Sequence, residues 1–106
     1  MKNQCKTALK QKSREQKDGL LIYSLHMENN ILATKTKLFA LKAISLSREL
    51  QKDNEFVVSK QFLRSATSIG ANLREAIVGQ SKKDFYAKIR ICYKEAHESA
   101  YWLELI

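Results

Sequence analysis

The chain has 106 residues, a net charge of +8 and no proline. This length predicts one domain, and a hydrophobic content of 44% excludes wholesale disorder. Two cysteines are too few for a disulfide framework, and the longest apolar run, residues 20–23, is too short to span a bilayer. With only three glycines and much Ala, Leu, Lys and Glu, the composition predicts an all-α, cytoplasmic protein with no membrane partner.

Residues 1–26 are polar and basic. They hold six Lys or Arg and two Asp or Glu, so they supply +4 of the net charge. The segment has no sustained apolar periodicity, which is typical of a flexible arm or a frayed helix. Met27 directly precedes the first regular pattern, so a functional unit that begins there is the alternative. We expect a bundle domain over residues 27–106, preceded by this basic extension.

Three segments of that domain repeat apolar residues at helical spacing. They predict helices over about 30–51, 58–78 and 82–106. Gly70 lies inside the second segment, where a glycine costs about 1 kcal/mol against alanine. We therefore expect the backbone of a neighbouring helix to approach closely there. Ser81 precedes the third segment and can cap its first turn.

The second and third segments carry the most regular stripes, and a short break joins them. Such a pair predicts an antiparallel helical hairpin. The third segment stays apolar to its last residue and has no terminal glycine. The sequence thus predicts an up-down four-helix bundle with three long helices present and the fourth missing. The stripes consist of Phe62, Ala66, Ile69, Leu73 and Ala76, and of Phe85, Ile89, Cys92, Ala96, Ser99, Leu103 and Ile106.

Basic residues lie opposite both stripes on a helical wheel. Neither basic line contains an acid, and Tyr101 lies on the line of the third helix, where it could stack on a base. A phosphate-contacting surface and an ordinary solvated face both fit this pattern. The predicted nucleic-acid contacts are Lys60, Arg64, Arg74, Lys83, Arg90 and Lys94.

The third helix is also apolar or aromatic outside its stripe. Ile91 and Trp102 share one flank, and Tyr86 and Tyr93 lie on the opposite flank. A monomeric bundle does not need these extra surfaces. They predict self-association or a protein partner. The alternative is that they cover the first helix and the absent fourth one.

Residues suited to catalysis are sparse. His26 and His97 have no zinc spacing, and the residue three positions before His97 is Lys94 rather than the glutamate of a di-iron motif. Cys92 has no histidine at a neighbouring helical position and is a poor nucleophile. The sequence therefore predicts no enzyme, no metal and no cofactor.

The hairpin resembles the four-helix-bundle family of 23S rRNA intervening-sequence proteins. The resemblance covers about residues 27–106 and is more specific in the hairpin than in the first helix. Its motifs are Ser59-Lys60-Gln61 with Arg64-Ser65, Thr67-Ser68-Ile69-Gly70-Ala71-Asn72 with Glu75-Ala76, Ser81-Lys82-Lys83-Asp84-Phe85, Glu95-Ala96 with Glu98, and Tyr101-Trp102-Leu103.

This resemblance implies an up-down bundle that assembles into a ring such as a pentamer. Some family members are encoded inside insertions in the 23S rRNA gene. A related branch resembles the accessory variability protein of diversity-generating retroelements, a basic bundle that binds nucleic acid and a reverse transcriptase. The family has no catalytic motif to carry over.

The combined prediction is a non-enzymatic, homo-oligomeric bundle that binds RNA or DNA through its basic outer faces. One alternative is a structural adaptor that docks a protein partner, for example a reverse transcriptase. The other is an inactive truncated copy, which the apparent absence of a fourth helix would explain.

Overall fold

The computed structural model describes residues 2–106, with side chains for all of these except residues 2–5, 22–26 and 28. Every regular element in this part of the chain is helical. The elements are α1 (Lys2–Glu28), α2 (Ile31–Lys52), α3 (Val57–Ile77) and α4 (Lys82–Leu105).

The predicted fold class is wrong in its count, because it had three long helices and a missing fourth, whereas the described residues form four helices. The additional helix is α1, which covers the segment expected to be an arm or a frayed helix. Apolar periodicity identifies helices that bury one face, and α1 lacks that periodicity. Most of its residues nevertheless have high helix propensity, among them many Lys, Gln, Leu and Glu, and proline is absent.

The chain divides into two compact units, residues 1–30 and residues 31–106. The first unit consists of α1 and the short connection after it. The second contains α2, α3 and α4. Their observed bounds lie within one residue of the expected ones at every end.

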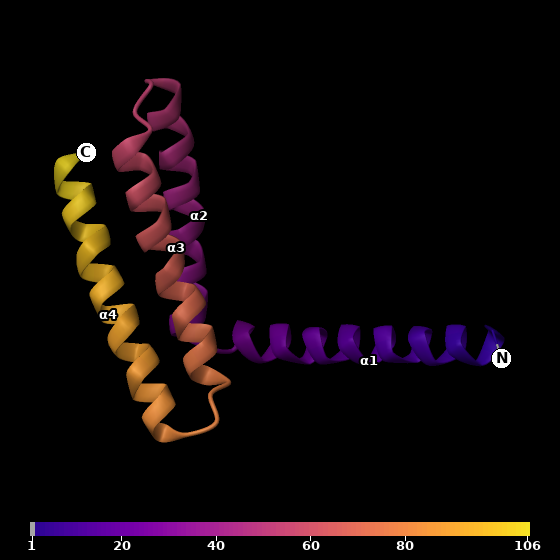
Figure 1. The fold of residues 1–106 in the computed structure, drawn as a ribbon. Coiled ribbons are helices and arrows are strands. Elements are labelled where there is room, and N and C mark those ends of the chain that lie inside the picture. Colours follow the sequence, from indigo (N-terminus) through magenta and orange to yellow (C-terminus); the bar gives the residue numbers. More distant parts are fainter. Residues whose placement is uncertain (1) are drawn as a thin grey trace. The chain divides into compact units, whose positions relative to one another are not determined.

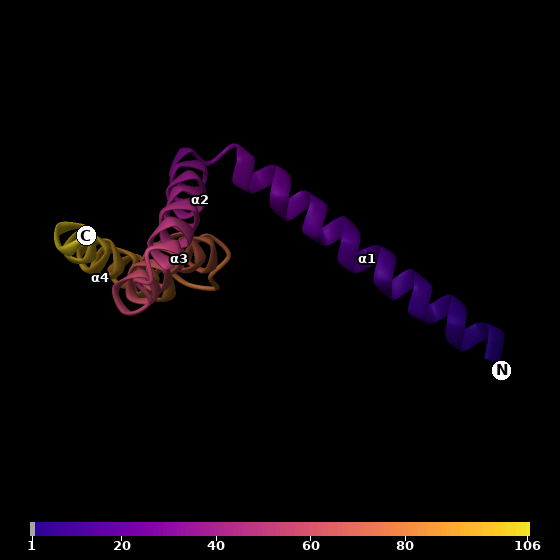
Figure 2. The same ribbon diagram turned by 90° about the horizontal axis from the view of Figure 1, so that it is seen from above.

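In the second unit, α3 packs against both α2 and α4 (Figure 1). The chain runs in one direction through α2, returns through α3 and reverses again through α4, and Figure 2 shows the same three helices from above. The hairpin expected from the two stripes is the α3–α4 pair. Because α3 lies between the other two helices, it has a neighbour on each side.

The core forms where these helices meet. Ala43 of α2 and Phe62 and Ala66 of α3 are fully buried, and Phe39 packs on them. The Phe39 and Phe62 rings meet edge to face with centroids 6.3 Å apart, a favourable arrangement for aromatic pairs. Trp102 of α4 also packs on this cluster, so all three helices contribute to one core.

The stripes of α3 and α4 are buried to different degrees. In α3, Phe62, Ala66, Leu73 and Ala76 are all buried. In the corresponding stripe of α4 only Ser99 is buried, and Leu103 remains 42% exposed. The central helix thus covers its apolar face far more completely than α4 does.

Gly70 faces α2 at a close approach between helices. A Cβ atom at this position would lie 3.3 Å from Thr36 Oγ1 and 3.7 Å from the Thr36 carbonyl carbon. The neighbour was expected to be a backbone, but the nearest atoms belong to the Thr36 side chain. Alanine would crowd this contact, which explains a mid-helix glycine despite its propensity cost of about 1 kcal/mol.

The two turns of this unit have clear local causes. Asn54 adopts a left-handed conformation with φ of 61°, which asparagine tolerates better than most residues. At the start of α4, Ser81 accepts a hydrogen bond from the Asp84 amide at 3.1 Å, as expected for a helix cap. Asp84 lies in the first turn, where a negative charge favours the helix dipole.

None of the helices described here combines the length and the hydropathy needed to cross a membrane.

Candidate nucleic-acid interface

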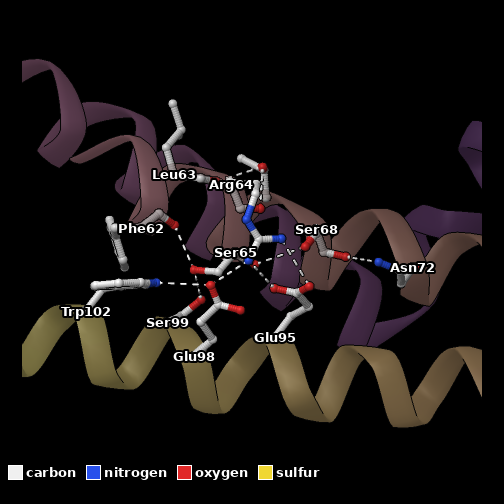
Figure 3. Close-up of polar contacts among 11 residues, drawn as sticks. Phe62, Leu63, Arg64, Ser65, Ser68, Asn72, Glu95, Glu98, Ser99 and Trp102 are labelled. Carbon is white, nitrogen blue, oxygen red and sulfur yellow. Dashed lines mark hydrogen bonds and ion pairs between the residues drawn. The ribbon is translucent and has the colours of Figure 1, made fainter. Parts of the chain in front are cut away.

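The α3–α4 contact is built around a polar layer (Figure 3). The Ser99 hydroxyl donates to Ser65 Oγ at 2.9 Å, and Ser65 donates in turn to the Phe62 carbonyl at 3.0 Å. Both hydroxyls are buried. Since an unpaired buried hydroxyl is costly, this chain of hydrogen bonds fixes which positions of α3 and α4 face each other.

Arg64 lies beside this layer and points to α4 rather than away from it (Figure 3). Its Nη1 and Nη2 atoms each lie 3.2 Å from a Glu95 carboxylate oxygen. Nη2 also lies 2.6 Å from Glu98 Oε1. Glu98 Oε1 accepts a further hydrogen bond from Trp102 Nε1 at 3.2 Å. One guanidinium therefore joins two carboxylates that are three residues apart on α4.

This ion-pair cluster alters the electrostatics of its members. The hydrogen bonds to Glu98 and then Glu95 raise the pKa of Arg64 further above its usual range. The Arg64 hydrogen bond, followed by the one from Trp102, lowers the pKa of Glu98. Two carboxylates against one guanidinium leave this surface locally negative, which disfavours an approaching phosphate.

The predicted basic line of α3 is therefore not a single surface. Arg64 faces α4 and its charge is matched there. Arg74 is half-buried and lies on the other flank, in a groove between α3 and α2. Lys60 is exposed, and it has no ion pair among the described residues.

The predicted basic line of α4 has different surroundings. Lys83, Arg90 and Lys94 are all exposed, and the ion pairs found in the described part of the chain use none of them. Lys83 and Arg90 line one surface hollow of about 510 Å³, together with Tyr86. Here two free cations flank an aromatic ring that is 64% exposed.

That hollow gives Tyr86 a second possible role. Lysine and arginine contact phosphates, and an exposed aromatic ring offers a stacking surface to an unpaired base. Tyr86 was predicted to be an interface residue for self-association or a partner, and the structure places it with the cations. Tyr101, the residue expected to stack, is 54% exposed and its ring contacts Trp102.

The other predicted interface residues also differ from one another. Trp102 is half-buried on the core cluster, and Ile91 is 38% exposed. Tyr93 is 68% exposed, and its ring meets His97 edge to face at 4.4 Å. Of the two predicted flanks, the one with Tyr86 and Tyr93 is thus the more accessible.

A second hollow lies between α2 and α4. It has a volume of about 360 Å³, and its walls are mostly apolar side chains of both helices, including Phe39 and Leu103, with Ile69 of α3 between them. Leu103 and Ala96 belong to the stripe predicted to be core, and this hollow is where that stripe remains exposed.

Groups for metal or thiol chemistry do not come together. Within the described residues, no three His, Cys, Asp or Glu side chains could hold one metal ion. The Cys92 thiol donates to the Ile69 carbonyl at 3.3 Å, and burial raises its pKa. A thiol in these surroundings is neutral near pH 7 and serves as a packing residue.

Two features of this site were missed from the sequence. Glu95 and Glu98 were placed to one side of α4, although their spacing of three residues lets both reach one cation on a neighbouring helix. Lys37 of α2, which lines the same groove as Arg74, is not among the predicted contacts. Both omissions concern partners from another helix, which a wheel drawn for one helix does not show.

The fold and this arrangement define a small helical protein with a basic outer surface, and the comparisons with known proteins agree on its class. Residues 28–106 match the profile of the 23S rRNA-intervening sequence protein family. The chain belongs to this family, as its motifs predicted. The match begins one residue after the expected start.

A solved structure gives the same result. The chain is similar to a protein with unknown function from the S23 ribosomal protein family of Bacteroides thetaiotaomicron VPI-5482. The identity is 50% and the TM-score is 0.69, over 71% of this chain and 70% of that chain. No curated protein matched the chain.

Proposed function

We propose that this protein is a non-enzymatic nucleic-acid-binding protein whose main contact surface is the outer face of α4. The observation that carries the proposal is the group of exposed cations Lys83, Arg90 and Lys94, which have no carboxylate partner in the described part of the chain. Phosphate contacts by such side chains bind RNA or DNA without reading its sequence. Tyr86, between two of them, adds a stacking surface for an unpaired base.

The position of the acidic residues supports this choice of surface. Glu95 is only 17% exposed, and together with Glu98 it is bound to Arg64 at the α3–α4 contact. Their charge is therefore held near α3. The predicted contacts in α3 contribute less, because Arg64 already has two carboxylate partners.

The test is a salt series with a structured RNA and with duplex DNA. Charge reversal in Arg90→Glu with Lys94→Glu should weaken binding of both and make the dependence of log K on log salt shallower by about 2. Arg48→Glu with Lys52→Glu is the matched control, because it makes the same change in net charge with the same residue types and spacing on exposed positions of α2. Equal effects of the two double variants would show that only net charge matters, and would remove the α4 surface from the proposal.

We also propose that copies of the chain associate through the edges of the α2–α3–α4 unit. The α2 edge exposes Ile31, Leu38 and Leu41, and the α4 edge exposes Tyr93, which does not line the hollow of Lys83 and Arg90. Two different apolar edges on one subunit suit a head-to-tail contact, and such contacts close into rings when the rotation permits. This agrees with the ring that the family resemblance implies.

Sedimentation of the full chain tests this second part. Leu38→Glu and Tyr93→Glu should each reduce the oligomer, and each removes only one side of the same contact. A monomeric wild-type protein over the micromolar range would reject self-association. If the wild-type protein is monomeric and captures a reverse transcriptase, loss of that capture in Tyr93→Glu would instead favour the adaptor role.

A further inference from the structure

A row of cations runs along one face of α1, which is a continuous helix (Figure 1). Lys6, Lys10, Arg14 and Lys17 follow one another at intervals of four, four and three residues. Residues with these spacings lie one above the other on a helix. The four cations, which we call the α1 stripe, therefore place one positive charge on each turn. At 1.5 Å per residue the stripe extends over about 16 Å.

The protein supplies no carboxylate partner to the α1 stripe. Its four side chains are exposed, and none of them belongs to an ion pair of the described residues. At about 100° per residue, Glu15 lies on the opposite face of the helix. Asp18 lies beside the end of the stripe, and it too belongs to no ion pair of the described residues. Because like charges one turn apart destabilise a helix, an external anion along the stripe would stabilise α1.

The rest of the α1 surface does not suit a membrane as the partner. Ala8, Lys12 and Glu15 lie opposite the stripe, and all three are exposed. Leu9 and Leu20 are both exposed on one flank, but they are too far apart in the sequence to form a continuous apolar face. A helix that lies in a membrane interface needs a broad apolar face opposite its cations. The described part of α1 has the cations without that face.

The composition around the stripe favours a duplex over a single strand. Residues 6–17 contain no aromatic side chain, whereas proteins that bind single strands use aromatic rings to stack the bases. A DNA duplex carries one negative charge per about 1.7 Å of its axis, and its major groove, about 12 Å wide, admits an α-helix. The major groove of an RNA duplex is deep and narrow. A straight row of cations on an otherwise polar helix therefore fits duplex DNA best.

We propose that the α1 stripe binds the phosphate backbone of duplex DNA. This contact goes beyond the α4 surface and does not depend on it, because α1 and α4 belong to different compact units of the chain. The lysine and arginine side chains contact phosphates, so the stripe contributes affinity without reading sequence. Since DNA neutralises the repulsion along the stripe, binding should also raise the helicity of α1.

The first test moves cations off the stripe without changing the composition of the full chain. The permuted variant exchanges Lys10 with Gln11 and Gln16 with Lys17, and these two residue types have similar helix propensity. It should bind a short duplex DNA about tenfold more weakly at moderate salt, and the dependence of log K on log salt should be shallower by about 2. Gln11→Lys with Lys12→Gln is the matched control. It makes the same kind of exchange outside the stripe and should bind like the wild type.

The second test keeps every cation and interrupts the helix. Ser13→Pro breaks α1 in the middle of the stripe, because proline removes a helical hydrogen bond and clashes with the preceding turn. Ser13→Ala is the control, since alanine favours the helix. Ser13→Pro should bind duplex DNA more weakly than Ser13→Ala. Circular dichroism with and without DNA measures the helicity of both variants.

The outcomes separate the α1 stripe from the α4 surface. Wild-type DNA binding by the permuted variant or by Ser13→Pro would mean that the charges act from a flexible arm, and would overturn the stripe. Loss of binding in Arg90→Glu/Lys94→Glu would then leave the proposed function intact. Loss in the two α1 variants alone supports the stripe and rejects the α4 surface.

A single-stranded DNA of the same sequence tests the choice of partner. A loss of affinity in the permuted variant that is confined to the duplex supports the assignment to duplex DNA. An equal loss of affinity for the single strand overturns that assignment.

Discussion

The basic side chains of α3 and those of α4 occupy equivalent wheel positions, yet their surroundings differ. α3 lies between two helices, so Arg64 reaches carboxylates of α4 and Arg74 lies in a groove against α2. On α4, Arg90 has no ion-pair partner in the described residues. A position opposite the core is therefore outward on a helix with a free side, but a long side chain on a central helix can still reach a neighbour.

The same contrast applies to apolar side chains, and it gives the largest expected effect. Phe62 of α3 is 1% exposed, whereas Phe85 of α4 is 39% exposed. Phe62→Ala should lower the free energy of unfolding by about 3–5 kcal/mol, since it leaves a cavity at the meeting point of three helices. Phe85→Ala should cost only about 1–2 kcal/mol, because part of that ring remains in water after folding.

Urea denaturation of both variants at one protein concentration measures this difference. The chemistry of the substitution is identical, so burial alone distinguishes the two sites. Equal losses would mean that α4 is covered as fully as α3 in solution. That result would contradict the edge position of α4 and would point to burial of Phe85 in an oligomer.

The second prediction separates the two arginines by function. Arg90→Gln should make the salt dependence of RNA binding shallower by about 1 and leave stability unchanged within about 0.5 kcal/mol. Arg64→Gln should leave RNA binding close to that of the wild type. It should lower the free energy of unfolding by about 1 kcal/mol, the upper end for exposed ion pairs, because Arg64 is 51% exposed.

Thermal unfolding and a salt series on the same protein samples measure both quantities. A double variant should show additive effects, since the two sites share no partner. If Arg64→Gln weakened RNA binding as strongly as Arg90→Gln, then phosphate would compete with Glu95 and Glu98 for Arg64, and the α3 line would be part of the interface.

How far the sequence predicts these differences depends on the residue. The apolar stripes predicted where α2, α3 and α4 begin and end, and Ser81 predicted the start of α4, because periodicity and capping are local properties. α1 was missed as a regular helix because its apolar residues have no such period. The partners of Arg64 depend on the register between α3 and α4, which the Ser65–Ser99 hydrogen bond helps to set.

The candidate site shows the same limit. Arg90 and Lys94 could be placed on the outer face of α4 from their spacing alone, since neither forms an ion pair with a neighbouring helix in the described residues. Arg74 could not be placed in one groove with Lys37, because that groove depends on the close approach at Gly70 and Thr36. A glycine inside a helix predicts a close neighbour at Gly70, but nothing in the sequence identifies Lys37 as a residue that comes with that neighbour.

The third prediction concerns this close approach and a smaller effect. Gly70→Ala should lower stability by less than about 1 kcal/mol, because crowding against Thr36 outweighs the gain in helix propensity. In a Thr36→Ala background the crowding is absent, and the same change should stabilise the protein by up to about 1 kcal/mol. Gly19→Ala is the control, since nothing lies within 4 Å of the added atom and only helicity should rise.

A double-mutant cycle of Gly70 and Thr36 gives the coupling between the two positions. Gly70→Ala that stabilises the protein with Thr36 present would mean that α2 and α3 can separate slightly without cost. The groove between α2 and α3 would then be wider and less defined than its lining residues indicate.

The smallest expected effect is a pH dependence at the α3–α4 contact. Arg64 holds the pKa of Glu98 below its ordinary 4.5 in the folded protein. A group with a depressed folded pKa stabilises the fold above its unfolded pKa, and this contribution is lost as the pH falls through the folded value. The contact should therefore be intact at pH 5 and above, and should weaken progressively below pH 4.5.

Trp102 is the only tryptophan and donates a hydrogen bond to Glu98, so its fluorescence reports on this contact directly. Glu98→Gln should be less stable than the wild type at pH 7, and the two stability curves should converge at acidic pH, where Glu98 is protonated in both folded and unfolded wild-type protein. Glu104→Gln is the control, because Glu104 is exposed and belongs to no ion pair of the described residues. A constant gap between wild type and Glu98→Gln down to the lowest pH would show that Glu98 acts through packing and not through its charge, and Arg64 would then be free to contact phosphate in the way proposed for Arg90.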